Sequence, residues 1–129
     1  MLPEEVRTAA QARAIVEARG LNHVKFGIFD NDGILRGKYI NRDKFFSGLD
    51  KGLGFCDVVL GWDSNDQQYD NVRFTGWHTA YPDAMVRLLP GTCRSLPLDP
   101  YAPAPSAKSA ASRQTLSVFI FPYLSKTKW

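Results

Sequence analysis

The sequence predicts a small α+β domain, and three observations support this prediction. Two segments have the composition and spacing of helices, and a glycine follows each of them. Two apolar segments flank the turn sequence Asp30-Asn31-Asp32-Gly33, as the strands of a β-hairpin do. A further apolar run, residues 84–89, is ended by Pro90-Gly91 and is typical of another strand.

Length and composition set the limits of this prediction. The chain has 129 residues, of which 44% are hydrophobic and 22% charged, as in an ordinary soluble domain. The net charge of +3 is small and scattered, so no nucleic-acid partner is expected. No segment approaches the roughly 18 apolar residues of a membrane span, and no export signal is visible, so we expect a cytoplasmic protein without a membrane partner.

The first helix is expected to begin at Pro3, because proline suits the first helical position, and to end before Gly20. Residues 23–29 alternate between apolar and other side chains, which predicts a strand. Residues 34–40 then form the return strand of the hairpin.

The second helix is expected to follow Asn41, which can cap its amino end. Its buried side would contain Phe45, Phe46 and Leu49, and Gly52 would follow its last turn. These features predict a short helix with one apolar face.

The remaining segments are less regular. Residues 54–60 are apolar and predicted to be extended. Residues 98–129 are predicted to be a poorly ordered tail rich in Pro, Ala and Ser, separate from a domain at residues 1–97. Within the tail, the apolar run 116–124 is either a buried strand or an exposed, aggregation-prone segment.

The most informative segment is residues 60–83, which we call the polar loop. It is rich in acids, amides and aromatic residues, and it is poor in aliphatic residues. Long loops of this kind are usually functional or disordered, and the aromatic residues argue against disorder.

The acids of the polar loop have two interpretations. They belong either to a solvated turn or to a site in which one or two of them face a cationic ligand. In the second case aromatic side chains form the wall of the site, because carboxylates and aromatic faces both attract ammonium or an amine. The candidate residues are Trp62, Asp63, Ser64, Asp66, Asp70, Trp77, Tyr81 and Asp83.

Other motifs favour structural roles. Asp30 and Asp32 lack the later ligands of a calcium loop, and Cys56 and Cys93 lack the spacing of metal ligands, so no metal is expected and both thiols are expected to be free. Arg36 and Lys38 are either a solvated face or an anion site. A site role for His78, within the polar loop, remains an alternative.

Several spaced motifs resemble the N-terminal domain of the glutamine synthetase family, over residues 6–97. The branch most similar to them ligates glutamate to amines or polyamines, as gamma-glutamylpolyamine synthetases do. The motifs are Asp30-x-x-Gly33-x-x-Arg36-Gly37-Lys38, Phe55 to Trp62-Asp63, Thr75-Gly76-Trp77, and Tyr81-Pro82-Asp83-Ala84.

The resemblance implies a β-grasp fold, a mixed sheet packed on one helix, with an additional N-terminal helix. It also implies a reaction of the full-length relatives, in which ATP with Mg²⁺ or Mn²⁺ phosphorylates glutamate and ammonia or an amine displaces the phosphate. The relatives form homo-oligomeric rings. Each active site lies between the catalytic domain of one subunit and the N-terminal domain of its neighbour.

Two acids match the family motifs residue by residue. Asp63, with Ser64 beside it, resembles the acid of the family's Phe-Asp-Gly-Ser-Ser loop, and Asp83 resembles the acid of its Ser-Asp-Met motif. The resemblance implies that both bind and deprotonate ammonium or an amine in a neighbouring subunit's site. This loop lacks Gly-Ser-Ser and is longer, so Asp66 and Asp70 stay open as alternatives to Asp63.

The segment after Leu98 contains no Glu or His and only one Asp, so no cofactor or metal site is expected there. We therefore expect a truncated ligase chain that lacks the catalytic domain and is inactive alone. One alternative is a non-catalytic interaction module that associates with an intact synthetase ring. Another is a separate domain that binds a small molecule through the polar loop.

Overall fold

The structure is a computed structural model that describes residues 1–96 in full and the backbone of residues 115–120. Its helices and strands are α1 (Ala9–Ala18), β1 (His23–Phe29), β2 (Leu35–Asn41), α2 (Arg42–Lys51), β3 (Leu53–Cys56), β4 (Asp83–Val86), β5 (Arg94–Leu96) and β6 (Thr115–Ile120). Short 3₁₀ turns cover Pro3–Glu5, Asp57–Leu60, Trp77–Thr79 and Pro90–Thr92.

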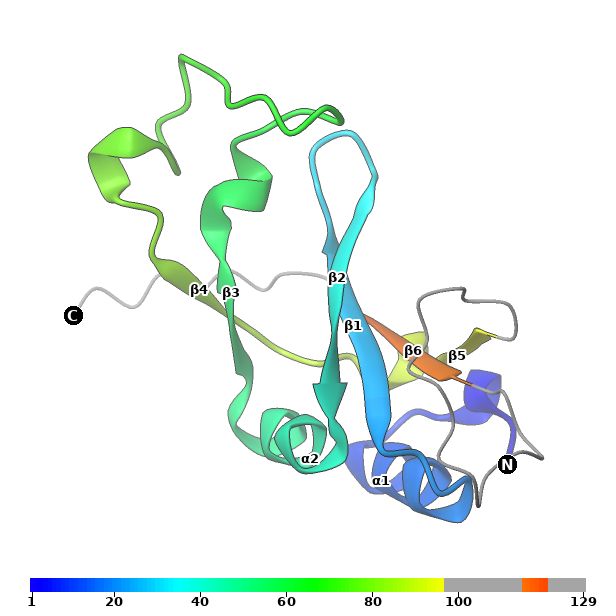
Figure 1. Ribbon diagram of the computed structural model, residues 1–129. Coiled ribbons are helices and arrows are strands. Elements are labelled where there is room, and N and C mark those ends of the chain that lie inside the picture. Colours follow the sequence, from blue (N-terminus) through cyan, green and yellow to red (C-terminus); the bar gives the residue numbers. More distant parts are fainter. Residues whose placement is uncertain (97–114, 121–129) are drawn as a thin grey trace.

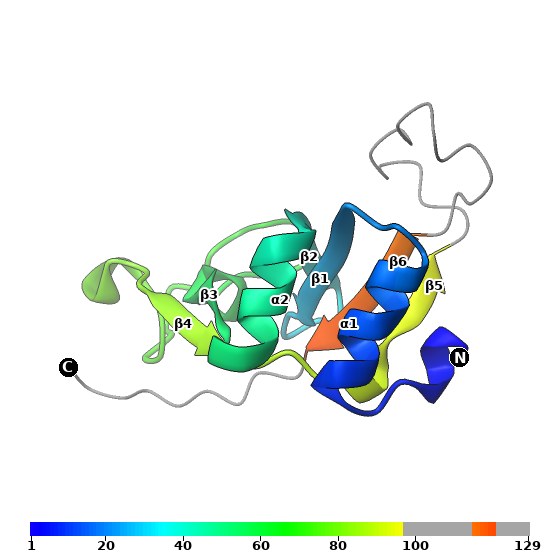
Figure 2. The same ribbon diagram turned by 90° about the horizontal axis from the view of Figure 1, so that it is seen from below.

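A mixed sheet of four strands, in the order β2-β1-β6-β5, forms the centre of the domain. β1 pairs antiparallel with β2 and parallel with β6, and β6 pairs antiparallel with β5. β3 and β4 form a separate antiparallel pair. The two helices lie side by side on one face of the sheet (Figure 1, Figure 2). The α+β prediction is confirmed, and the arrangement is consistent with a small β-grasp-like domain.

The structure describes part of the apolar run 116–124, and that part is a strand. Residues Thr115–Ile120 form β6, a strand that lies between β1 and β5. The rest of the predicted tail, residues 98–114 and 121–129, lies outside the described residues.

The first helix begins later than predicted. Thr8 caps α1: its Oγ1 accepts a hydrogen bond from the Gln11 N–H, and Gln11 Oε1 accepts one from the Thr8 N–H, both at 3.2 Å. This reciprocal capping box satisfies free donors at the start of the helix. Val6 is extended and buried, and Pro3–Glu5 forms a separate 3₁₀ turn before it. The prediction of one helix from Pro3 is therefore wrong.

The hairpin and the second helix are confirmed. Gly33 has a φ of 76° in the turn between β1 and β2, a conformation that favours glycine. Asn41 caps α2 by accepting a hydrogen bond from the Lys44 N–H at 2.8 Å. Gly52 follows the helix with a φ of 78°. Local turn and cap chemistry thus explains the boundaries of these elements.

Two segments beside the polar loop are extended over a shorter range than predicted. The sequence predicts extended backbone at residues 54–60, but β3 ends at Cys56 and the 3₁₀ turn Asp57–Leu60 follows it. β4 ends at Val86, although residues 84–89 were predicted as a strand. In both cases periodicity could not locate the end, because the flanking residues are apolar but not paired.

The core lies between the central sheet and the helices. β1 contributes Val24, Phe26 and Ile28, the alternating residues of the sequence pattern. The Phe26 ring meets the Phe55 ring edge-on, with centroids 5.7 Å apart, and so joins the central sheet to β3. The core residues are Val6, Ala12, Ile15, Val16, Val24, Phe26, Ile28, Ile40, Phe45, Leu53, Phe55, Val59, Val86, Leu88 and Cys93.

Candidate functional site

The polar loop lies at the end of the molecule away from the helices, beside the tip of the β1–β2 hairpin (Figure 1). A buried pair fixes its base: the Thr75 hydroxyl donates a hydrogen bond to Asp57 Oδ1 at 2.6 Å, and both residues are buried. The Asp57 N–H donates to the Pro82 carbonyl at 3.3 Å. A buried carboxylate needs such donors, so Asp57 holds the middle and the end of the loop together.

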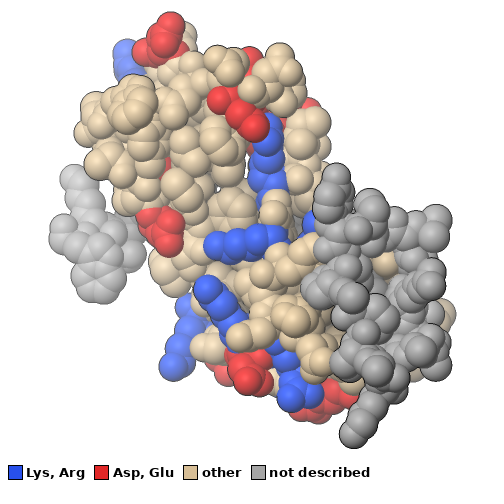
Figure 3. All heavy atoms as spheres, in the orientation of Figure 1, with Lys and Arg blue, Asp and Glu red and all other residues tan. Residues whose placement is uncertain are grey.

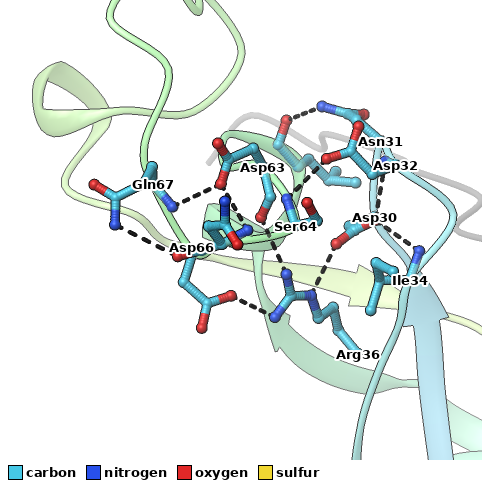
Figure 4. A network of polar contacts seen from close by, with 11 residues as sticks. Asp30, Asn31, Asp32, Ile34, Arg36, Asp63, Ser64, Asp66 and Gln67 are labelled. Atoms are coloured by element: carbon cyan, nitrogen blue, oxygen red, sulfur yellow. Dashed lines mark hydrogen bonds and ion pairs between the residues drawn. The ribbon is translucent and has the colours of Figure 1, made fainter.

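The first half of the polar loop is bound to the hairpin tip through Arg36 (Figure 4). Its Nε donates to Asp30 Oδ2 at 2.8 Å, its Nη1 to Asp66 Oδ1, and its Nη2 to the Asp63 carbonyl at 3.1 Å. We call the set of residues that link hairpin and loop the hairpin–loop network. Its members are Asp30, Asp32, Arg36, Asp63, Ser64 and Asp66.

Two further hydrogen bonds reinforce this link. The Ser64 N–H donates to Asp32 Oδ2 at 2.8 Å, and Asn31 Nδ2 donates to the Leu60 carbonyl at 2.7 Å. The hairpin tip therefore contacts the loop through both side chains and backbone, which gives the loop a defined conformation.

Asp30 is the buried centre of the hairpin–loop network. Burial raises the pKa of its carboxyl, but hydrogen bonds from Arg36 and from the backbone N–H groups of Ile34 and Asp32 outweigh burial and lower the pKa below its usual value. The carboxylate is therefore ionised at neutral pH and pairs with a guanidinium that is always charged. At neutral pH, Asp30 and Arg36 therefore form an ion pair at the base of the hairpin tip.

Asp63 shapes the backbone of the loop. Its Oδ1 accepts hydrogen bonds from the N–H groups of Asn65 (2.8 Å) and Gln67 (3.0 Å), as aspartate does in a local turn. Its other carboxylate oxygen has no hydrogen bond to the part of the chain that is described. One oxygen thus holds the turn, and the other can accept a proton or a ligand.

Trp62 precedes this turn in the chain and contacts Arg36. The guanidinium carbon of Arg36 is 5.2 Å from the centre of the Trp62 ring, a cation–π contact. The indole Nε1 of Trp62 is buried and has no hydrogen-bond partner among residues 1–96. Trp62 is therefore a packing partner of the network, at the loop side of Arg36.

The second half of the loop forms a pocket of about 260 Å³. Three aromatic residues and one acid, Asp70, contribute to its wall. The lining residues are Gly61, Gln68, Tyr69, Asp70, Val72, Gly76, Trp77, His78 and Tyr81. Tyr69 joins the pocket to the hairpin–loop network: burial, and then the charges of Asp32, Asp63 and Asp30, raise the pKa of its phenol.

The backbone of the pocket is strained at Ala80 and Tyr81, which have φ values of 56° and 50°. Such left-handed conformations cost a non-glycine residue about 1–3 kcal/mol, and they cluster at functional sites. They place the Tyr81 ring edge-on to Trp77, with centroids 5.5 Å apart. The Tyr81 hydroxyl donates a hydrogen bond to Gln68 Oε1 and so links Tyr81 to an earlier part of the loop.

Asp83 lies apart from both groups, on β4. Its side chain is exposed and covers Gly54 of β3, where an added Cβ would lie 2.6 Å from Asp83 Oδ2. The absence of a side chain at Gly54 leaves the space that this carboxylate occupies.

The structure thus divides the predicted site residues into three places. Asp63, Ser64 and Asp66 belong to the hairpin–loop network, with Trp62 packed against it. Asp70, Trp77 and Tyr81 line the pocket together with His78. Asp83 lies on the short sheet.

Sequence reasoning missed the residues that hold the loop. Arg36 was considered as a solvated or anion-binding cation, but it pairs with acids of its own chain. Neither Asp57 nor Thr75 is among the predicted site residues, although Thr75 belongs to one of the family motifs. The available signal for Asp57 was one charged residue inside an apolar run, because such a residue needs a buried partner.

Basic and acidic side chains lie in different parts of the face that Figure 3 shows. In Figure 3, Lys and Arg side chains gather over the middle of the face and Asp and Glu side chains lie mostly toward its two ends.

Among the residues with described side chains, no group of three or more His, Cys, Asp or Glu could hold a metal ion. In the same part of the chain, no helix has the length and apolar character needed to cross a membrane.

Comparison with known proteins agrees with this fold and loop. The chain is 57% identical to type-1 glutamine synthetase 2 of Dictyostelium discoideum over 74 residues, which are 57% of the chain and 14% of that protein. It is 32% identical to glutamate–isopropylamine ligase of Pseudomonas sp over 92 residues, 70% of the chain and 19% of that protein. The matches thus span less than a fifth of either relative. No model of a known protein family matches the chain.

The fold and the site define a small α+β domain whose acidic, aromatic loop is fixed to a β-hairpin. The chain belongs to the glutamine synthetase family and contains an N-terminal region of that family. The resemblance in the sequence motifs is confirmed.

Proposed function

We propose that this domain supplies the amine side of a glutamate–ammonia or glutamate–amine ligase site. In this proposal Asp63 and Asp83 face the catalytic domain of a neighbouring subunit in a ring. Their carboxylates bind ammonium or an alkylammonium ion and accept its proton, because a nearby carboxylate stabilises the cation and can act as a base. Glutamate, ATP and Mg²⁺ or Mn²⁺ would be bound by that catalytic domain.

The names of the two relatives support this reaction class. One is a glutamine synthetase and the other a ligase of glutamate with isopropylamine. Transfer of these activities to the present chain is part of the proposal, since the matches span only the smaller part of each relative.

The geometry of Asp63 is the observation that carries the proposal. One of its oxygens is fixed by the Asn65 and Gln67 amides, and the loop around it is fixed to the hairpin by Arg36. A carboxylate held through one oxygen keeps the other as an oriented acceptor, as a base that receives a proton requires.

A chimera tests the proposal. The matched segment of the Dictyostelium synthetase would be replaced by the corresponding segment of this chain, and glutamine formation measured with ATP and ammonium. We expect an active chimera in which Asp63→Asn or Asp83→Asn lowers kcat by at least tenfold, within the roughly 10²–10⁴-fold that acid–base groups contribute. Asp43→Asn, on the exposed side of α2, is the control. Full activity of the Asp63→Asn, Asp83→Asn double variant would disprove the roles of both acids.

A second candidate function is docking on an intact synthetase ring without catalysis. The exposure of Trp77 (84%) and Met85 (47%) supports it, because Trp and Met are enriched at protein–protein interfaces relative to the rest of the surface. Co-purification of the tagged chain with a full-length synthetase, lost in Trp77→Ser, would favour docking. If the two proteins do not co-purify even at high concentrations of both, docking is excluded.

A further inference from the structure

Three acids of the polar loop, Asp63, Asp66 and Asp70, are candidates for binding the amine. They differ in the hydrogen bonds and ion pairs that their carboxylates make. Asp63 Oδ1 already accepts two backbone hydrogen bonds, and Asp66 Oδ1 pairs with Arg36. The carboxylate of Asp70 has no hydrogen bond or ion pair to the described part of the chain, and Asp70 lines the pocket. Of the three, Asp70 is the acid with its full capacity left for a ligand.

The composition of the pocket wall selects for positive charge. Asp70 is its acid, and neither Lys nor Arg is among the lining residues. His78 supplies an ionisable nitrogen group to the wall. Its Nε2 donates a hydrogen bond to the Arg73 carbonyl at 3.1 Å. An anion would meet the Asp70 carboxylate without a cationic partner in the wall, whereas a cation would be attracted to it.

The aromatic residues add a second attraction for cations. Trp77 presents most of its ring to solvent, and Tyr81 supports it edge-on at 5.5 Å. Because the Tyr81 hydroxyl is bound to Gln68, this pair is fixed before any ligand arrives. A ring face beside a carboxylate favours an organic ammonium ion, whose alkyl part contacts the ring while its charge faces the acid.

The size of the pocket limits the ligand. Its 260 Å³ equal the share of about nine water molecules in the liquid, and binding pockets of drug-sized ligands are larger, at about 300–1,000 Å³. A short alkylammonium ion fits this volume, and a nucleotide does not.

We infer that the pocket between Asp70 and Trp77 is a recognition site for a small primary alkylammonium ion, and that Asp70 is the carboxylate that binds it. The inference rests on the proposed function, since it names the place where the amine substrate first meets this domain. Binding at Asp70 is distinct from proton transfer at Asp63 and Asp83, and the whole chain would show it without a catalytic partner.

The test is a titration of the full ¹⁵N-labelled chain with n-butylammonium chloride, followed by NMR at constant ionic strength. We expect saturable shifts of the Trp77 indole N–H and of backbone amides near Gln68 and Asp70. The Trp62 indole N–H, outside the pocket, should stay unchanged. Sodium butyrate and n-butanol, which match the alkyl chain but lack the positive charge, should produce no saturable shift.

Two variants with equal changes in charge test the role of Asp70. Asp70→Asn should raise the Kd for n-butylammonium at least tenfold. Asp43→Asn, at an exposed acid of α2 outside the pocket, should leave the Kd unchanged. The inference is overturned if wild-type shifts do not saturate, if Asp70→Asn binds as tightly as wild type, or if Asp43→Asn weakens binding as much as Asp70→Asn.

A negative result in the titration would leave the outcome of the chimera experiment open. A chain that binds no alkylammonium but whose Asp63 and Asp83 are required for glutamine formation would refute the pocket and leave the proposed function in place. If instead the chain binds n-butylammonium but the chimera is inactive, the pocket is supported and the proposed function is refuted.

Discussion

Asp30 and Arg36 determine, at the scale of single residues, how the loop is displayed. Their ion pair lies within the hairpin, and Arg36 also reaches across to the loop, where it binds Asp66 and the Asp63 carbonyl. A planar guanidinium with several donors suits this arrangement, which a lysine ammonium would not reproduce. The geometry of the site acids therefore depends on a residue that is not itself expected to touch a substrate.

The first prediction concerns pH. Because the pKa of Asp30 is lower in the folded protein than in the unfolded chain, its ionised form stabilises the fold above the unfolded pKa, about 3.9. This stabilisation is lost as the pH falls through the folded pKa. We expect the free energy of unfolding to decrease below about pH 4, and Asp30→Asn to remove part of that decrease.

Urea unfolding between neutral pH and about pH 3 measures this effect. Asp43→Asn, at an exposed acid, should keep the wild-type pH dependence. Identical pH dependence in Asp30→Asn and wild type would show that Asp30 does not contribute.

The second prediction concerns the base of the loop. Thr75→Val keeps the shape of the side chain but removes the hydroxyl that donates to the buried Asp57 carboxylate at 2.6 Å. A buried acceptor without its donor costs about 1–3 kcal/mol, so we expect a loss of stability of that size in urea unfolding. Thr75→Ser keeps the hydroxyl and should lose less. Equal losses in both variants would assign the effect to packing.

At the scale of elements, the hairpin is the support of the site. Gly27 of β1 faces Gly37 of β2, and an added Cβ at Gly27 would lie 2.6 Å from the Arg36 carbonyl. Two glycines opposite each other allow the strands to approach closely just before the hairpin tip.

The third prediction concerns the start of α1. Thr8→Ala removes the side chain that caps the helix, and loss of such a cap costs about 0.5–2 kcal/mol. We expect a lower midpoint of thermal unfolding, followed by circular dichroism. Thr8→Ser retains the capping oxygen and should stay near wild type. If Thr8→Ala is as stable as wild type, the helix does not depend on this cap.

Elements were predicted well where local chemistry specifies them. The hairpin turn contains Asp, Asn and Gly, and the cap of α2 is Asn41, so both were located from the sequence. The start of α1 differs from the prediction because the Thr8–Gln11 capping box begins the helix, whereas Pro3, although also favourable at a helix start, begins a separate 3₁₀ turn.

At the scale of the whole molecule, β6 decides the topology. It joins residues near position 118 to β1 in parallel, across most of the length of the chain, and connects β5 to the sheet. Parallel pairing requires a long crossover and cannot be inferred from a turn. The central sheet is therefore completed by a segment that the sequence predicted to lie in a tail.

The fourth prediction tests this pairing. Val118→Pro removes a backbone N–H from a strand with a neighbour on each side, where proline is not tolerated. We expect a loss of stability on the order of 3 kcal/mol, the cost of proline in the interior of a regular element. Amide hydrogen exchange of β1 should become faster in the variant. Val118→Thr keeps the N–H and is the control. Unchanged exchange in Val118→Pro would show that β6 does not contribute to the sheet.

The candidate site was predicted in part. The sequence alone located the polar loop, its acids and its aromatic residues, because their composition excludes a packed strand or helix. It did not separate Asp70 from Asp63 and Asp66, since all three lie in the same loop within a few residues. That separation depends on Arg36 and on the hairpin tip, which are distant in the sequence.

The sequence by itself determined the α+β class, the hairpin, α2 and the family, because these depend on local periodicity, on turn and cap residues, and on spaced motifs. The tertiary structure decided the place of β6 in the sheet, the buried pair of Asp57 and Thr75, and the division of the loop acids between an ion-paired network and an open pocket. These features depend on contacts between residues far apart in the chain, and their energies depend on burial and charge pairing, which exist only once the chain is folded.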